Sequence, residues 1–142
     1  MRSVRQILDG KDTPLVTVSP QDSVLEALKR MAESSVGAVL VMDGGELVGI
    51  MTERDYARKV VLQGRASAST PVSAIMTSPV RTVTPSQRAR ECMQLMTELR
   101  FRHLPVVEDG VLLGVVSIGD LLKTVIEEQA EEIDQLQAYI AS

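Results

Sequence analysis

An internal repeat limits the fold of this chain more than any other feature of its sequence. Shifting the 142-residue sequence by 65 positions aligns Pro14–Asp55 with Pro79–Asp120 without a gap, and 12 of the 42 aligned positions are identical. A shift of 68 aligns two short apolar segments, Val4–Leu8 and Val72–Met76, which precede the copies and are called the lead-ins below. Since a repeat of this length is one supersecondary unit, two copies of that unit make up most of the chain.

Each copy predicts the same order of elements: strand, helix, strand, strand, helix. A β-branched segment runs into a hydroxyl residue and a proline, Ser19-Pro20 or Thr84-Pro85, a pair typical of the N-cap and first position of a helix. Apolar residues then recur at helical spacing, and two strand patterns around a glycine turn follow. The second helix is expected from Thr52 and from Ser117. The predicted strands are Leu15–Val18, Ala38–Met42 and Glu46–Met51 in one copy, and Val80–Val83, Leu104–Val107 and Val111–Val116 in the other.

The repeat divides the chain into four parts. Residues 1–63 are the first copy, residues 64–71 a small polar linker, residues 72–125 the second copy and residues 126–142 a helical extension. A copy of about 60 residues buries too little surface to be comfortably stable alone, so we expect the two copies to pack together. The predicted fold class is α+β, with two β-α-β-β-α repeats packed sheet to sheet with pseudo-twofold symmetry and a cleft where they meet.

Composition excludes several classes of function. One cysteine, Cys92, rules out a disulfide framework and a multi-thiolate metal site, and one histidine, His103, rules out most histidine-based metal sites. A net charge of −4 and 2% aromatic residues make nucleic acid a poor partner. No apolar run approaches the roughly 18 residues of a membrane span, so we expect no membrane partner and a cytoplasmic location.

The most informative local pattern is G-x-x-[ST]-x-x-D, which occurs at Gly49–Asp55 and again at Gly114–Asp120. One interpretation is structural, because the hydroxyl residue and the acid three positions later form a capping box at the start of a helix. The other is a binding site, because free backbone N–H groups and a positive helix end attract an anion. The carboxylate can also accept hydrogen bonds from paired ribose hydroxyls. The local pattern leaves both interpretations open.

Together these features resemble a pair of CBS domains (cystathionine-β-synthase domains), a Bateman module. The resemblance rests on the two lead-ins, the segments Thr17–Pro20 and Thr82–Pro85, the strand Arg102–Val107 and the two G-x-x-[ST]-x-x-D motifs, and it covers residues 4–125. Small stand-alone bacterial CBS-domain proteins are similar. The resemblance implies a non-enzymatic regulatory or sensor module, with no catalytic cofactor, that binds an adenosine nucleotide such as AMP, ADP, ATP or NAD in the cleft. It also implies a regulated protein, which the sequence does not identify.

The resemblance further implies which residues form the nucleotide sites. Asp55 and Asp120 would hold the ribose hydroxyls, and Thr52 and Ser117 would contact ribose or phosphate. The adenine pocket is implied to comprise Thr17, Val18, Gly37, Ala38 and Val39 in the first copy, and Thr82, Val83, His103, Leu104 and Pro105 in the second. Arg54 and Arg102 are the favoured phosphate partners, because they lie inside the motif segments and arginine makes bidentate contacts. Since only the second copy keeps the family's His-x-Pro strand, we expect the two sites to differ.

A rival hypothesis comes from another functional class. The chain could be a ligand-independent interaction or scaffold protein in which both G-x-x-[ST]-x-x-D motifs are only helix caps. An enzyme has the least support, since no base, nucleophile and metal set converges in the sequence.

Residues 119–141 have a long helical pattern, and residues 121–142 carry a net charge of −4, equal to that of the whole chain. Ile126, Ile133 and Ile140 recur every seven residues, with Leu122, Gln129 and Leu136 at the companion positions and the acids on the outward face. A helix with such an apolar stripe needs a partner. The sequence therefore predicts a homodimer.

Overall fold

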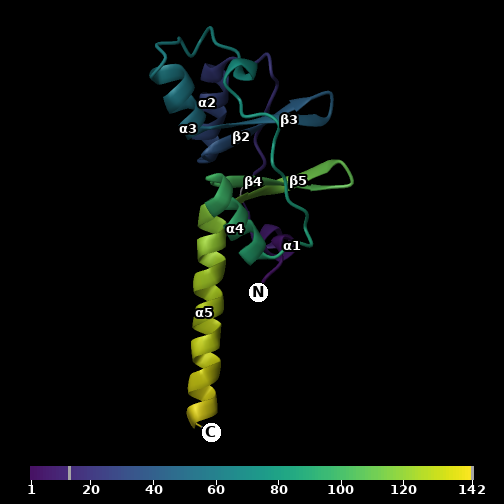
Figure 1. Cartoon of the computed structure of the whole chain (residues 1–142), viewed down its shortest axis with the longest axis vertical. Helices are drawn as coiled ribbons and strands as arrows, with labels where there is room; N and C mark the ends of the chain where they lie inside the picture. The colour runs from purple at the N-terminus through teal and green to yellow at the C-terminus, as the bar shows by residue number, and fades with distance from the viewer. Residues whose placement is uncertain (13, 142) are drawn as a thin grey trace. The chain divides into compact units, whose positions relative to one another are not determined.

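The fold comprises two compact units, whose boundaries differ from those of the repeat. The computed structural model describes residues 1–12 and 14–141. Thr13–Arg81 form one unit, here called the central unit, and Met1–Asp12 join Thr82–Ser142 in the other, the terminal unit. Each unit combines one small sheet with helices, as the ribbon shows (Figure 1). The predicted α+β class, with two related halves and a C-terminal helix, is confirmed.

The central unit contains a three-stranded sheet. Strand β1 (Thr17–Val18) pairs in parallel with β2 (Ala38–Asp43), which pairs antiparallel with β3 (Glu46–Thr52). Helix α2 (Val24–Ser34) packs against the sheet through Val24, Ala27 and Met31. Helix α3 (Glu53–Tyr56) continues as a π-helical turn (Ala57–Val61), and the lead-in of the second copy forms a 3₁₀ turn (Val72–Ala74). The core of the unit is therefore built from α2, the sheet and this lead-in.

The terminal unit repeats this arrangement with changes at both ends. Strands β4 (His103–Glu108) and β5 (Val111–Ser117) pair antiparallel. Their register shifts at Val106/Val107, as the register of β2 and β3 shifts at Val41/Met42 in the central unit. Helix α4 (Ala89–Leu99) covers the pair together with α1 (Val4–Asp9), the lead-in of the first copy. Helix α5 (Ile118–Ala141) confirms the long C-terminal helix, and Ser142 lies outside the described residues.

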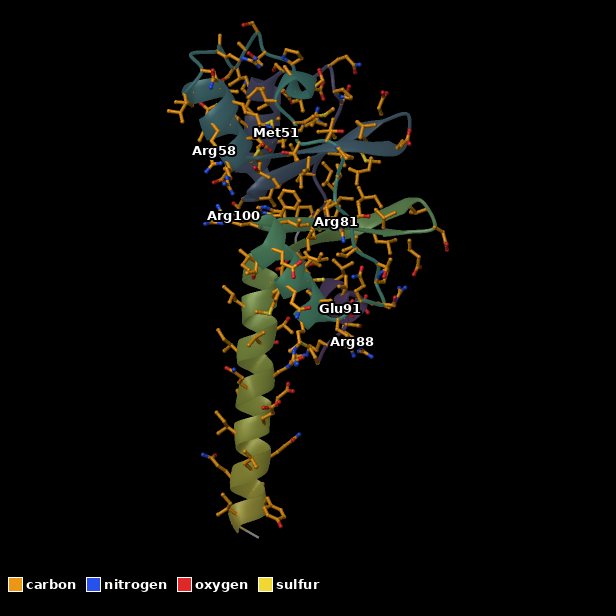
Figure 2. The ribbon with its side chains drawn as sticks, in the orientation of Figure 1. Met51, Arg58, Arg81, Arg88, Glu91 and Arg100 are labelled. Atoms are coloured by element: carbon orange, nitrogen blue, oxygen red, sulfur yellow. The ribbon has the colours of Figure 1, made fainter. Side chains whose placement is uncertain are left out.

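The prediction that the first helix of each copy starts at the hydroxyl-proline pair was wrong. The Ser19 N–H donates to Asp22 Oδ2 at 2.8 Å and the Asp22 N–H donates to the Ser19 carbonyl at 3.1 Å, so these two residues close a turn and do not start the helix. Helix α2 begins only after Ser23, whose Oγ accepts the Glu26 N–H. In the second copy α4 begins after Arg88, with Glu91 accepting the Arg88 N–H, and Figure 2 labels both residues at this end of the helix.

The first strand of each copy is also shorter in the structure than the sequence predicted. Only Thr17–Val18 of the predicted strand Leu15–Val18 pairs with β2, and Val80–Val83 is reduced to an isolated parallel bridge between Val83 and Val106. The chain must turn sharply after each pair to reach the helix start. The segment therefore contributes one or two ladder positions and no more.

Each lead-in packs in the unit that contains the other copy's strands. Helix α1 lies against β5, where a Cβ placed on Gly114 would come 3.0 Å from Leu8 Cδ2. The lead-in of the second copy lies against β3 in the same way, and a Cβ on Gly49 would come 2.9 Å from Met76 Cγ and 3.2 Å from Met76 Cβ. The glycine of each G-x-x-[ST]-x-x-D motif is thus the position where a lead-in side chain meets the strand.

We predict that Gly49→Ala lowers the free energy of unfolding by about 1–3 kcal/mol, because the added methyl overlaps the part of Met76 nearest its backbone. Urea unfolding of the full chain measures this. Gly10→Ala is the matched control, since a Cβ there meets its neighbours at ordinary distances of 3.7 and 3.8 Å. Equal midpoints for the two variants would contradict the close packing of the lead-in.

Candidate functional site

Each G-x-x-[ST]-x-x-D motif crosses a junction between a strand and a helix. Thr52 ends β3 and caps α3, and Ser117 ends β5 directly before α5. Strand pairing places Ala38 opposite Thr52 and His103 opposite Ser117. The Glu53 N–H donates to the Gly37 carbonyl at 3.1 Å, and the Ile118 N–H donates to the Arg102 carbonyl at 2.9 Å. The residues before β2 and β4 are therefore tied to the two motifs by backbone pairing.

The first strands bring in the remaining predicted residues. Thr17 and Val18 lie beside β2, and the Val83 N–H donates to the Pro105 carbonyl at 2.9 Å. The sixteen predicted residues thus fall into two matching sets, one in each unit. The central unit holds Thr17, Val18, Gly37, Ala38, Val39, Thr52, Arg54 and Asp55, and the terminal unit holds Thr82, Val83, Arg102, His103, Leu104, Pro105, Ser117 and Asp120.

Four of the apolar members have their side chains in a hydrophobic core. Val18 and Val39 belong to the core of the central unit, and Val83 and Leu104 to that of the terminal unit. At these positions only the backbone is left to meet a ligand. By contrast, Thr52, Ser117, His103 and Asp120 are half-buried, and Arg54 and Arg102 are exposed.

The Asp55 carboxylate is enclosed by its own unit. Its Oδ2 accepts the Thr52 N–H at 3.0 Å and the Thr52 hydroxyl at 3.1 Å. Its Oδ1 accepts the Thr77 hydroxyl at 3.0 Å and pairs with Lys59 Nζ at 3.1 Å. A carboxylate offers about four acceptor positions, so this set of donors uses all of them. Asp55 is only 8% exposed.

The Asp120 carboxylate has a more open arrangement. Its Oδ2 accepts the Ser117 N–H at 2.8 Å and Lys11 Nζ at 2.7 Å, while the Asp120 N–H donates to Ser117 Oγ at 3.2 Å. Within the residues that the structure describes, Oδ1 accepts no hydrogen bond, and the side chain is 22% exposed. Burial raises the pKa of Asp120, but the hydrogen bonds from Lys11 and Ser117 and the Lys11 charge outweigh it, so the pKa lies below its ordinary value.

Sequence reasoning missed three residues that contact the motif carboxylates. Lys59 follows Asp55 by four positions, and this helical spacing was a usable signal. Thr77 and Lys11, which follow the lead-ins, bond to carboxylates 22 and 109 residues away in the sequence. Lys11 also donates to the Val115 carbonyl at 2.7 Å, which fixes its ammonium group beside β5. These two residues reach the motifs only because each lead-in packs in the unit that contains the other copy's strands.

Cys92 lies with Ala89 and Met96 on the apolar stripe of α4, a position that predicts a small core residue, and it is one. It is fully buried, and burial, followed by the nearby Glu91 charge, raises the pKa of its thiol to about 11. Among the described residues no group of three or more His, Cys, Asp or Glu side chains could hold a metal ion. In the same part of the chain, no helix has both the length and the apolarity needed to cross a bilayer.

Comparison with known proteins finds the same domain in both repeats. The family model described as "CBS domain" matches residues 4–62 and 72–127. The chain is 48% identical over 124 residues to the mitochondrial CBS domain-containing protein CBSX3 of Arabidopsis thaliana, covering 84% of this chain and 60% of CBSX3. It is 36% identical over 115 residues to YhcV, a CBS domain-containing protein of Bacillus subtilis, covering 81% of each.

A solved structure agrees with the fold. A putative signal-transduction protein with CBS domains from Burkholderia ambifaria superposes with a TM-score of 0.87 and 55% identity, over 90% of this chain and 96% of that one. The fold is therefore shared with a protein of similar length.

We predict that Lys11→Met raises the Asp120 pKa, since only the Ser117 hydrogen bonds then lower it, and destabilises the chain by roughly 1–3 kcal/mol at pH 7, because it leaves a partly buried carboxylate without its cation. A carboxyl with a lowered folded pKa stabilises the fold above its unfolded value near 3.8 and loses that contribution as the pH falls through the folded value. The stability difference should therefore shrink below pH 4. Urea midpoints across pH 3–7 measure it, with the exposed Lys29→Met as control. A difference that stays constant with pH would contradict the pairing.

Proposed function

Because the chain belongs to the CBS-domain family as a tandem pair, we propose that it is a non-enzymatic regulatory module that binds an adenosine nucleotide, AMP, ADP, ATP or NAD, at its G-x-x-[ST]-x-x-D motifs. Members made only of such domains are generally regulatory, and the chain matches no catalytic family among the comparisons. The chain spans 60% of CBSX3, so any partner protein also belongs to this proposal. The cytoplasmic location expected from the sequence stays a prediction.

The observation that carries the proposal is the unused acceptor at Asp120. Lys11 and the Ser117 N–H both bond to Oδ2, so Oδ1 remains available to a ribose hydroxyl. Ser117 Oγ accepts the Asp120 N–H, and the Ser117 hydroxyl is one of the hydrogen-bond donors that lower the Asp120 pKa, so this hydroxyl lies directly beside the carboxylate. A hydroxyl and a carboxylate in this relation suit the two neighbouring hydroxyls of a ribose.

Charge at the same motif suits a phosphate. Ser117 stands directly before the 24-residue helix α5, whose first N–H groups and positive dipole end favour an anion. Arg102 is exposed next to His103, the residue paired with Ser117 in the sheet. We therefore assign ribose to Asp120 and Ser117 and phosphate to Arg102. Adenine is assigned to Thr82, His103 and Pro105 and to the backbone of Val83 and Leu104, whose side chains lie in the core.

The equivalent set around Asp55 is a weaker candidate. A ribose hydroxyl would have to displace Lys59 or Thr77 from a carboxylate whose acceptors are already in use. This saturation favours the scaffold hypothesis for the first motif alone, where the capping box with Thr52 and the bonds from Thr77 and Lys59 use the acceptors of the acid. We propose that Thr17, Val18, Gly37, Ala38, Val39, Thr52, Arg54 and Asp55 form a second site of lower affinity.

We also propose that the module acts as a homodimer. Nucleotide binding can change the arrangement of the assembly only if the ligand prefers one arrangement to another.

We predict that isothermal titration of the full chain detects at least one of AMP, ATP and NAD, and that Asp120→Asn weakens that binding at least tenfold, about 1.4 kcal/mol. Asp55→Asn should weaken the binding less, because its carboxylate is already occupied by Lys59 and Thr77. Asp134→Asn, an exposed acid on α5, is the matched control.

Two outcomes separate the alternatives. A bound nucleotide raises the melting temperature by mass action, so no shift and no heat of binding up to about 1 mM would favour the scaffold. Binding that depends on Asp55 and not on Asp120 would reverse the assignment of the two sites.

A further inference from the structure

Helix α5 presents an apolar stripe that nothing in its own unit covers along most of its length. The unit packs Leu121 and Thr124 of its first turns, and the helix then extends beyond α1 and α4 (Figure 1). At 1.5 Å per residue, its 24 residues span about 36 Å. Figure 2 shows its side chains directed outward on all sides in the C-terminal half. The exposed apolar residues include Leu122 at 49%, Ile126 at 65%, Ile133 at 53%, Leu136 at 62% and Ile140 at 80%.

These residues occupy one seam with coiled-coil spacing. Ile126, Ile133 and Ile140 take the a positions of three heptads, and Leu122, Gln129 and Leu136 take the d positions. β-branched residues at a combined with leucine at d favour two parallel strands over larger bundles. An apolar seam with this period is matched by another helix of the same period, and a second copy of α5 supplies one.

The acidic residues of the helix are held away from this seam. Arg2 of the same chain bonds Glu127 Oε2 and Glu131 Oε1, each at 2.7 Å, and its backbone N–H donates to Glu128 Oε1 at 2.6 Å. These acids occupy b, c and f positions of the heptads, on the outer side. Their partial neutralisation by Arg2 lowers the repulsion that two copies of an acidic helix would otherwise meet.

We propose that α5 pairs in parallel and in register with α5 of a second copy along the seam from Leu122 to Ile140. In this register Gln129 meets Gln129 of the second copy, so the two amides can bond to each other, and Glu132 lies beside Gln137. The antiparallel alignment with the same overlap places Gln129 against Ile133 and brings the two Glu132 carboxylates opposite each other. The parallel pairing therefore satisfies the one polar layer and avoids a like-charge contact.

This pairing gives the homodimer of the proposed function its surface and its orientation, and it is tested without nucleotide. The full chain should have a mass of about 31 kDa by size-exclusion chromatography with light scattering, twice the 15.5 kDa of one chain. Ile133→Lys, in the seam, should return it to one chain, whereas Asp134→Lys, one residue on and facing outward, should leave the dimer intact. Circular dichroism should show that both variants keep the folded units.

Cysteine cross-linking tests the orientation. Because the native Cys92 is buried with a raised thiol pKa, Ile140→Cys should be the reactive thiol, and a parallel pair should join two such chains through a disulfide on mild oxidation. A monomer in the unmodified chain, or a dimer that survives Ile133→Lys, would overturn the proposal. So would a dimer that cross-links only when Leu122→Cys is combined with Ile140→Cys. In each case nucleotide titration of the same samples is unaffected by the result.

Discussion

The close approach of each lead-in to a strand glycine determines where the other contacts of this chain form. Gly114 lets Leu8 lie on β5, and Gly49 lets Met76 lie on β3, at distances that leave no room for a side chain. Residues that follow each lead-in are thereby carried to a motif acid. Lys11 reaches Asp120 after the first lead-in, and Thr77 reaches Asp55 after the second.

The two motifs are alike in backbone and different in the state of their carboxylates. Both have the same capping arrangement, with the acid accepting the N–H of the hydroxyl residue three positions earlier. In the central unit a second hydroxyl and a lysine complete the contacts of the Asp55 carboxylate, whereas among the described residues of the terminal unit Asp120 Oδ1 accepts no hydrogen bond. Repetition of a motif therefore conserves its geometry without conserving its capacity to accept a ligand. This difference is the basis for assigning unequal roles to the two sites.

Local patterns predicted what local contacts determine. The capping boxes at Thr52 and Ser117, the burial of Cys92 and the long helix that ends at Ala141 follow from residues within one or two turns of each other, and all are present. The starts of α2 and α4 were misplaced because Ser19 and Thr84 make the expected local bonds but close turns instead of helices. The contact between Lys11 and Asp120 could not be predicted from the sequence. It depends on the packing of α1 in the terminal unit, and no local pattern indicates that packing.

A crystal structure of the full chain grown with AMP or ATP tests the central claim most directly. The account predicts a ribose whose hydroxyls lie within hydrogen-bond distance of Asp120 Oδ1 and Ser117 Oγ, with Lys11 still on Oδ2 and with Asp55 still bonded to Lys59 and Thr77. A nucleotide held at Asp55 with Lys59 displaced, while the Asp120 carboxylate has no ligand, would contradict it.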